Sequence, residues 1–264
     1  MIKHFLVFLV ALGSVVLIWA LPLLGFKWVL WGVIALGLWE YASMAFPRLP
    51  DRIFTTLFGL AIASSMIWND SPALHTGYFV IALFFLFVWG LFRREPVETI
   101  ASRMGLIVFG GMYLGLALPY WAWIREFGIE WIMMLLLPAS LTDTFAMLAG
   151  KTFGKHKLGI ISPNKTLEGF IGGFFGSFTG LWLADLLFFP QTNLSLASIL
   201  SIGSTIAVLV MLGDLFESLL KRSFKVKDSG HIVPDHGGMM DRLDAMVFVA
   251  PFFYYLILHK GLSL

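Results

Sequence analysis

The sequence predicts an all-α fold, a polytopic integral membrane bundle of about nine transmembrane helices. Hydrophobic residues make up 59% of the 264 residues and charged residues only 13%, whereas a soluble protein carries about 25% charged residues. The apolar segments are long and continuous, without the alternation of barrel strands, so they favour helices over a β-barrel. The chain has no cysteine, which excludes disulfide bonds and thiol catalysis.

The expected helices follow one another along the chain, separated by short polar breaks. The first apolar run begins like a signal peptide, but it lacks a convincing cleavage site of small residues, so we expect it to be retained. Gly172, Gly173 and Gly176 in the seventh run are spaced for close packing between helices. The expected spans are roughly residues 5–25, 28–46, 53–68, 78–92, 104–123, 130–149, 169–189, 197–213 and 245–259.

The basic residues predict an orientation. If the N-terminus lies in the cytoplasm, only Lys27, Arg125 and Lys260 of the 18 Lys and Arg residues fall on the outer side, as the positive-inside rule requires. We therefore expect a multi-pass protein of the inner (plasma) membrane with its active site facing the cytoplasm. The net charge of only +2, with acids interleaved among the bases, argues against nucleic-acid binding.

The polar chemistry lies in the second half of the chain. Residues 1–103 carry few charges within their spans and are interpreted as an N-terminal transmembrane scaffold. Residues 104–264 are interpreted as a catalytic transmembrane region, with two cytoplasmic loops at 150–168 and 214–244.

Two carboxylates at the ends of adjacent spans predict a metal site. Asp214 ends the eighth span and Asp241 precedes the ninth, so the loop between them can bring them together. Mg²⁺ takes one or two carboxylates and completes its shell with phosphate oxygens and water. Asp244 shares a helical face with Asp241, although an acid near a helix start is also favourable without a function. Asp143 is a third candidate, either as a ligand or as a partner of one.

Other polar residues surround these carboxylates in the sequence. Glu217 and Lys221 follow Asp214 on one helical face, where the alternative to a site is a structural ion pair between them. Gly237 and Gly238 precede the last helix, where free amides can hold an anion, although such a pair is more often a turn. Neighbouring His236 is a candidate donor to phosphate.

The loop at 150–168 ends in further candidate phosphate ligands. Lys165 and Thr166 stand at the start of the seventh span, followed by Glu168. No Walker A loop is present here. Three earlier lysines have an alternative role as topology determinants or contacts to anionic lipid. They are Lys151, Lys155 and Lys157.

Four short motifs resemble the signature of the phosphatidate cytidylyltransferase (CDP-diacylglycerol synthase) family. The resemblance extends over residues 100–260 and includes Asp143 and the loop from Ser162 to Thr166. It departs from the usual pattern only at the apolar positions Leu167 and Val233. The motifs are Ser-x-Leu-Lys-Arg at 218–222, Lys-Asp-x-Gly at 227–230, Pro-x-His-Gly-Gly at 234–238 and Asp-Arg-Leu-Asp at 241–244.

The resemblance implies that CMP passes from CTP to phosphatidic acid, giving CDP-diacylglycerol and pyrophosphate for phospholipid biosynthesis. It also implies Mg²⁺, a monovalent cation such as K⁺ as a candidate second metal, a homodimer, and membrane lipids as surroundings. Asp214 and Asp241 are the expected metal ligands. The expected catalytic residues are Asp143, Lys221, Arg222, Lys227, Asp228, Arg242 and Asp244. The expected substrate-binding residues are Ser162, Lys165, Thr166, Glu168, Glu217, Ser218, His236, Gly237 and Gly238.

Two other classes of protein remain open at this point. Intramembrane carboxylates often mark the ion path of a transporter, but here the charges gather at one face of the membrane and do not cross it. A different membrane enzyme that uses CTP, such as a polyprenol kinase, is the second alternative.

Overall fold

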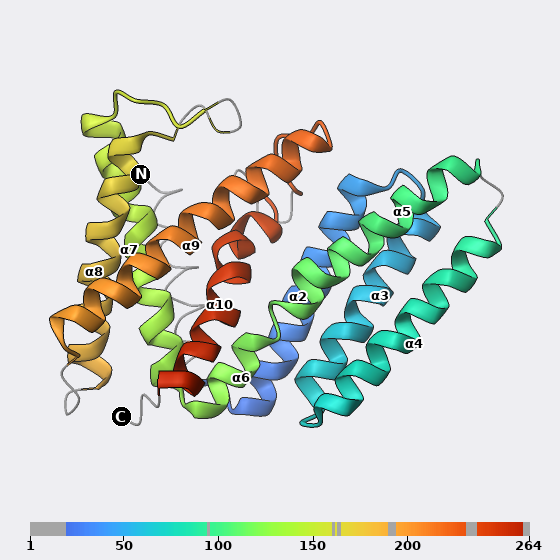
Figure 1. Ribbon diagram of the computed structural model, residues 1–264, viewed down its shortest axis with the longest axis horizontal. Helices are drawn as coiled ribbons and strands as arrows, with labels where there is room; N and C mark the ends of the chain where they lie inside the picture. The colour runs from blue at the N-terminus through green and yellow to red at the C-terminus, as the bar shows by residue number, and fades with distance from the viewer. Residues whose placement is uncertain are drawn as a thin grey trace.

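The computed structural model describes residues 20–93, 96–159, 162, 165–189, 194–230 and 237–260, and this part of the chain is helical (Figure 1). Its only bridge between extended residues joins Lys157 and Thr166. The predicted all-α fold is confirmed. The helices are α2 (Leu23–Ala45), α3 (Leu49–Trp68), α4 (Pro72–Leu91), α5 (Val97–Gly110), the π-helix η1 (Gly111–Leu116), α6 (Tyr120–Phe127), α7 (Ile129–Phe153), α8 (Leu167–Phe188), α9 (Leu196–Ser223) and α10 (Met240–Lys260).

Six helical segments in the described residues are long and apolar enough to cross a membrane. The chain is therefore a multi-pass membrane protein, but the predicted count of nine spans is not reproduced. Charged residues lower the hydropathy of a helix, and both α3 and α10 have charges in their first turns but are not among the six. Most of the expected span at 5–25 lies outside the described residues. The six segments are Leu23–Ala45, Pro72–Leu91, Val97–Phe127, Ile129–Phe153, Leu167–Phe188 and Leu196–Ser223.

The long helical segments alternate in direction, with α5, η1 and α6 forming one of them, so the basic loops meet at one end of the bundle. The connections α2–α3, α4–α5, α7–α8 and α9–α10 all lie at the upper end in Figure 1. Lys27 near the start of α2 and Arg125 in α6 belong to the opposite end. The one-sided charge pattern expected from the sequence is therefore present in the fold, and it places the two charged loops on the same side.

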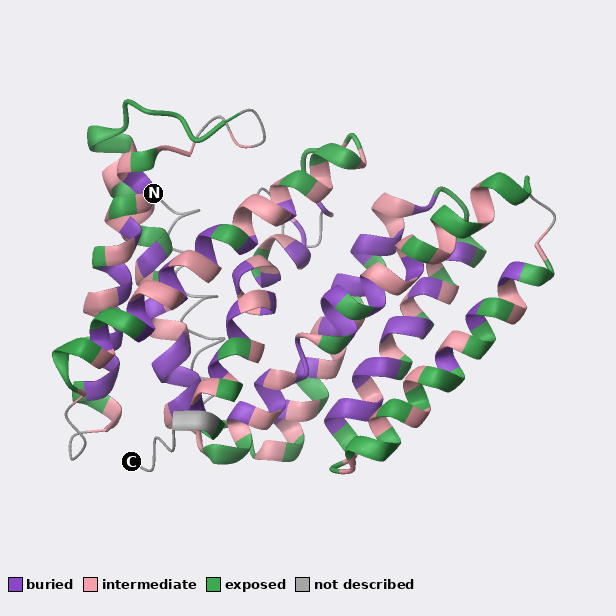
Figure 2. Ribbon diagram, in the orientation of Figure 1, coloured by how far each residue is buried: buried purple, intermediate pink, exposed green. Residues whose placement is uncertain are grey.

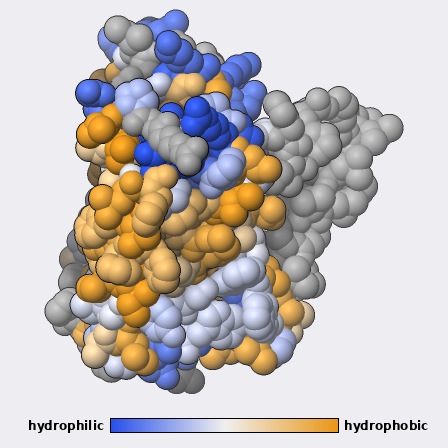
Figure 3. All heavy atoms as spheres, turned by 90° about the vertical axis from the view of Figure 1, so that its right-hand side faces the viewer, coloured by the Kyte–Doolittle hydropathy of each residue, from blue (hydrophilic) through white to orange (hydrophobic). Residues whose placement is uncertain are grey.

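The outer faces of the bundle are apolar. Figure 2 shows buried residues on the faces that helices turn toward one another, and exposed residues along the outside of α4 and α8. Figure 3 shows a hydrophobic band across the middle of the face seen there, with hydrophilic residues gathered at the upper end. Phe84 and Phe85 of α4 are 62% and 59% exposed. Such a surface suits contact with lipid and not with water.

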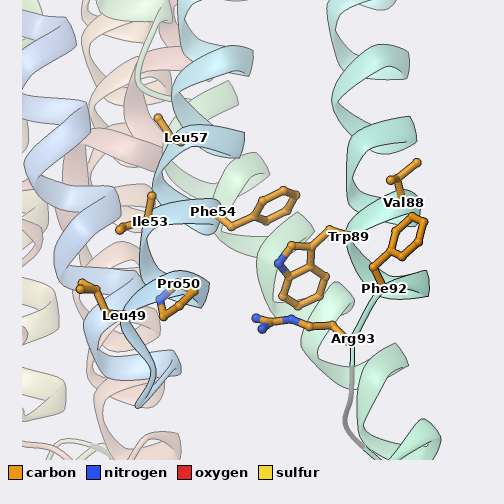
Figure 4. Close-up of a pocket in the computed structure, with 9 residues that line it drawn as sticks. All are labelled: Leu49, Pro50, Ile53, Phe54, Leu57, Val88, Trp89, Phe92 and Arg93. Carbon is orange, nitrogen blue, oxygen red and sulfur yellow. The ribbon is translucent and has the colours of Figure 1, made fainter.

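An apolar groove of about 560 Å³ runs between α3 and α4 on this side of the molecule (Figure 4). Phe54 and Trp89 stack across it with ring centroids 5.1 Å apart. Arg93 closes its charged end, with its guanidinium 4.3 Å from the centroid of Trp89. Arg93 also pairs with the fully buried Asp51, as does Arg103 at 3.0 Å. The negative charge of the buried Asp51 is thus compensated by two arginines.

Glycines on α8 let it pack directly against the backbone of α7. A Cβ atom at Gly176 would overlap the carbonyl oxygen of Leu141, and one at Gly180 would lie 2.8 Å from the nitrogen of Pro138. Small residues of this kind allow transmembrane helices to approach closely. The expectation of close packing at these glycines is confirmed, and this contact holds the loop at 150–168 beside the ends of both helices.

We expect Gly176→Ala to destabilise the protein, because the added methyl group must push α7 and α8 apart. Overpacking of this kind costs about 1–3 kcal/mol. Thermal unfolding of purified protein in detergent should show a lower melting temperature. Gly32→Ala in α2 is the matched control, because nothing lies within 4 Å of its new Cβ atom. Equal melting temperatures for the two variants would contradict the packing argument.

Candidate active site

The candidate site lies where α9 ends and α10 begins, at the charged end of the bundle (Figure 1). A Cβ atom at Gly213 of α9 would overlap the carbonyl oxygen of Asp244 and lie 3.0 Å from the Cα atom of Ala245. The two helices therefore touch backbone to backbone at this glycine. Their contact brings Asp214, the next residue of α9, close to Asp244 of α10.

Three carboxylates gather around this contact. Asp214, Glu217 and Asp244 each offer an oxygen atom, and these atoms all lie within 4.8 Å of one another. Glu217 is 1% exposed, and its Oε1 atom has no hydrogen-bond partner among the described residues. Like charges this close raise the energy of the site unless a cation lies between them. The three carboxylates provide oxygen ligands, and one buried oxygen, Glu217 Oε1, has no hydrogen-bond partner among the described residues. This arrangement fits a hard divalent cation such as Mg²⁺.

Two lysines border the carboxylates. Lys165, from the loop before α8, forms an ion pair with Asp214. Lys221 lies 2.7 Å from Glu217 Oε2 and 2.5 Å from Asp241 Oδ1. The ion pair between Glu217 and Lys221, considered above as an alternative to a site, is thus present, but it occupies only one oxygen of Glu217.

The electrostatics of Lys165 connect α7 to the same cluster. Burial lowers the pKa of the Lys165 ammonium, whereas the negative charges of Asp143 in α7 and Asp244 in α10 act to raise that pKa. Asp143 therefore lies near enough to Lys165 for its charge to act on that ammonium, and its role in the site stays a prediction. The loop at 150–168 and the helix pair α9–α10 form one polar region.

Asp241 contacts other groups than Asp214, and its expected role as a metal ligand stays a prediction. The sequence paired it with Asp214, but the structure groups Asp214 with Glu217 and Asp244. The Oδ2 atom of Asp241 accepts hydrogen bonds from Gly238 N at 2.7 Å and from Ser229 Oγ at 2.8 Å. Because Asp241 lies in the first turn of α10, it turns back to the preceding chain. Asp244, nearly one helical turn later, faces α9.

The amides at the start of α10 are also used differently from the expectation. Gly238 N donates to Asp241, while Met239 N and Met240 N donate to Glu40 of α2 at 2.9 and 2.8 Å. The sequence predicted that these backbone N–H groups would bind an anion. In the structure they donate hydrogen bonds to carboxylates of the protein itself. Gly237 has φ +80°, a backbone conformation that favours glycine. His236 lies outside the described residues.

Sequence reasoning assigned no role to Glu40. It is 3% exposed inside an otherwise apolar stretch of α2. A lone acid in a membrane helix is a signal in itself, because such a charge is costly without partners. The sequence could not identify those partners, which lie about two hundred residues away in the chain.

Two residues of the loop at 150–168 organise the loop itself. Thr166 Oγ1 caps α8 by accepting from Gly169 N at 3.1 Å. Glu168 accepts from the backbone N–H groups of Lys155 and His156 and lies 2.6 Å from the His156 ring nitrogen. Both had been expected to bind substrate. In the structure, Thr166 and Glu168 shape the loop that presents Lys165.

The remaining expected residues lie in the charged segments at 150–168 and 214–244 that border the site. Ser162 and Ser218 are half-buried, and the others are exposed. Arg222 is turned toward the backbone of Val226. The exposed residues are Arg222, Lys227, Asp228 and Arg242.

Known proteins that this chain resembles include three bacterial phosphatidate cytidylyltransferases. It is 44% identical over 149 residues to that of Staphylococcus aureus (strain COL), which covers 56% of each chain. It is 43% identical over 147 residues to that of Staphylococcus haemolyticus (strain JCSC1435), covering 55% of this chain and 56% of the relative. It is 39% identical over 160 residues to that of Bacillus subtilis (strain 168), covering 59% of each. The chain thus spans about half the length of the curated relatives it matches.

The family comparison extends over nearly the whole chain. Residues 2–259 match the cytidylyltransferase family. The match includes the carboxylates and lysines of the candidate site and also the helices of the scaffold. The chain therefore belongs to the cytidylyltransferase family.

Proposed function

We propose that this protein transfers CMP from CTP to phosphatidic acid, releasing CDP-diacylglycerol and pyrophosphate. The observation that carries the proposal is the cluster of Asp214, Glu217 and Asp244, bordered by Lys165 and Lys221, at the polar end of a membrane bundle. Family membership and the names of the relatives support the same reaction. A site at this depth can meet a lipid phosphate from the membrane and a nucleotide from water.

The reaction needs positioning more than proton transfer. An oxygen of the phosphatidate phosphate attacks the α-phosphorus of CTP, and the bond from that phosphorus to the β-phosphate oxygen breaks. Phosphatidate already carries an anionic oxygen, so no strong base is needed. The main barrier is to hold two anions in line against their repulsion. Lys165 and Lys221 are the cations nearest the carboxylates, and they offset charge on the triphosphate and the departing pyrophosphate.

Asp214, Glu217 and Asp244 would hold Mg²⁺, which neutralises charge on phosphate oxygens when it is bound. Asp241 accepts a hydrogen bond from Lys221 at 2.5 Å and so orients its ammonium group. The exposed bases Arg222, Lys227 and Arg242 serve the incoming phosphates. A second cation such as K⁺ and a homodimer are proposed on the family resemblance alone.

We expect Asp214→Asn and Asp244→Asn each to fold but to lose activity by more than about 100-fold. Even residues that only orient metal ligands cost about 10-fold to 100-fold when changed. The measurement is Mg²⁺-dependent formation of CDP-diacylglycerol by purified, monodisperse variants. Because the two residues act as a unit, the double variant should be scarcely worse than either single variant.

Asp185→Asn is the control for these variants. Asp185 is buried in α8 at the opposite end of the bundle, where it accepts from Leu194 N at 2.8 Å. Near-normal activity in Asp214→Asn or Asp244→Asn would remove that residue from the metal site.

We expect Lys165→Ala to lower kcat/KM by about 100-fold, because removing one donor that stabilises developing charge has an effect of this size. Lys157→Ala is the matched control. Lys157 lies in the same loop and is exposed, and its bridge to Thr166 is a backbone contact. Initial rates at varied CTP and varied phosphatidate separate the effects on the two substrates. Equal losses in both variants would show that only the general charge of the loop matters.

We also propose that the charged end of the bundle faces the cytoplasm. Because the chain has no cysteine, single cysteines report orientation without a background. Lys155→Cys, in the loop at 150–168, should resist a membrane-impermeant maleimide in intact cells and react after the cells are opened. Asp70→Cys, between α3 and α4 at the other end, should react in intact cells. The reverse pattern would overturn the orientation.

A further inference from the structure

Among the described residues of the scaffold, Glu40 is the one acid whose carboxylate contacts the start of α10. Its Oε1 atom accepts from Met239 N at 2.9 Å, and its Oε2 atom accepts from Met240 N at 2.8 Å. A negative charge at the N-terminus of a helix is stabilised by the unpaired amides there. In most helices such a cap comes from a residue adjacent in sequence, whereas here it comes from α2.

The chain before α10 is shaped around this carboxylate. A Cβ atom at Gly230 would lie 2.5 Å from Glu40 Oε1, and one at Gly238 would lie 2.6 Å from Glu40 Cδ. Only glycine allows the backbone to approach so closely at these two positions. Gly238 was expected to let the backbone approach a ligand. In the structure it lets the backbone approach the side chain of Glu40.

A chain of contacts leads from Glu40 to the acidic cluster. The hydroxyl of Ser229 lies 3.2 Å from Glu40 Oε2 and 2.8 Å from Asp241 Oδ2. Asp241 binds Lys221, and Lys221 binds Glu217. The same first turn of α10 carries Asp241 and leads to Asp244. Any rotation of that turn would therefore move groups on both sides of the cluster.

We propose that Glu40 is a positioning residue for the site: its carboxylate fixes the first turn of α10, and through that turn the directions of Asp241 and Asp244. This inference rests on the proposed function for its kinetic consequences. The structural consequence, a fixed helix start, is independent of the reaction. The N-terminal scaffold thereby contributes a residue on which the catalytic half depends.

Glu40→Gln tests the proposal. The amide keeps the shape of the side chain but replaces one accepting oxygen with a donor, so one amide of Met239 or Met240 loses its partner. We expect kcat to fall by about 10-fold to 100-fold, as for other residues that orient metal ligands, with KM for CTP nearly unchanged. Two measurements need no turnover. Hydrogen exchange in peptides covering 237–245 should become faster, and the Mg²⁺ concentration needed to raise the melting temperature should increase.

Asp185→Asn is the matched control, because it also converts a buried acid that accepts a backbone N–H into an amide. If Glu40→Gln shows the same kcat, exchange and Mg²⁺ dependence as Asp185→Asn, the proposal is overturned. If Glu40→Gln does not fold, Gly238→Ala and Ser229→Ala decide in its place. The same three changes in those variants support the proposal, and wild-type behaviour overturns it.

The outcomes also separate this proposal from the proposed function. Failure of the wild-type protein to form CDP-diacylglycerol would overturn the function. The exchange and Mg²⁺ measurements would then still decide the role of Glu40. An active wild type with an unperturbed helix start in Glu40→Gln would overturn the positioning role alone.

Discussion

The backbone contact between α9 and α10 at Gly213 is the constraint on which the site depends. A side chain there would meet the carbonyl oxygen of Asp244 and the Cα atom of Ala245. The two helices would separate, and Asp214 would no longer share a cluster with Asp244. The glycine thus contributes no chemistry of its own. It sets the distance at which carboxylates from two helices can act on one ion.

Charges within this bundle are compensated in two different ways. In the scaffold, two arginines surround Asp51, so the buried acid has a surplus of cations. In the site, three carboxylates meet two lysines, and Glu217 retains an uncommitted buried oxygen. Burial of a polar atom without a partner is costly. In the first arrangement the protein supplies the cations that pair with the acid, whereas in the second Glu217 Oε1 has no hydrogen-bond partner among the described residues.

The sequence predicted the helices well because hydropathy reports directly on burial in a membrane. It also located the polar site, since charged residues in such a chain lie where water or a partner can reach them. It could not show which of Asp241 and Asp244, three positions apart on the same helix, lies in the group with Asp214 and Glu217. That choice depends on how α10 is rotated, and the rotation is set by Gly213 on α9 and Glu40 on α2. Neither contact leaves a local pattern in the sequence.

The number of spans was harder to predict for a related reason. Helices α3 and α10 carry charges in their first turns, so they differ in composition from the six apolar segments. In α10 those charges serve the site, because Asp241 and Asp244 lie in or just after the first turn. In a helix with an apolar body and a polar first turn, the polar residues lower the mean hydropathy. Such a helix is therefore difficult to recognise as a membrane span from mean hydropathy alone. The acidic residues near the start of α10 therefore make the span harder to predict from hydropathy, and the same residues indicate the candidate site.

Contacts in the structure cross the division at residue 103 that the sequence predicts. The amides that begin α10 are held by Glu40 from the first half of the chain. At the opposite end, Lys27 pairs with Glu126 at 2.7 Å, and Arg125 Nη2 donates to Leu21 O at 3.3 Å. These contacts tie α2, and the residues just before it, to the second half of the chain at both ends. Because α2 is fixed at its two ends, its Glu40 can hold the start of α10 in one place. The start of α10, which carries Asp241, is thus held in place by a residue from the first half of the chain.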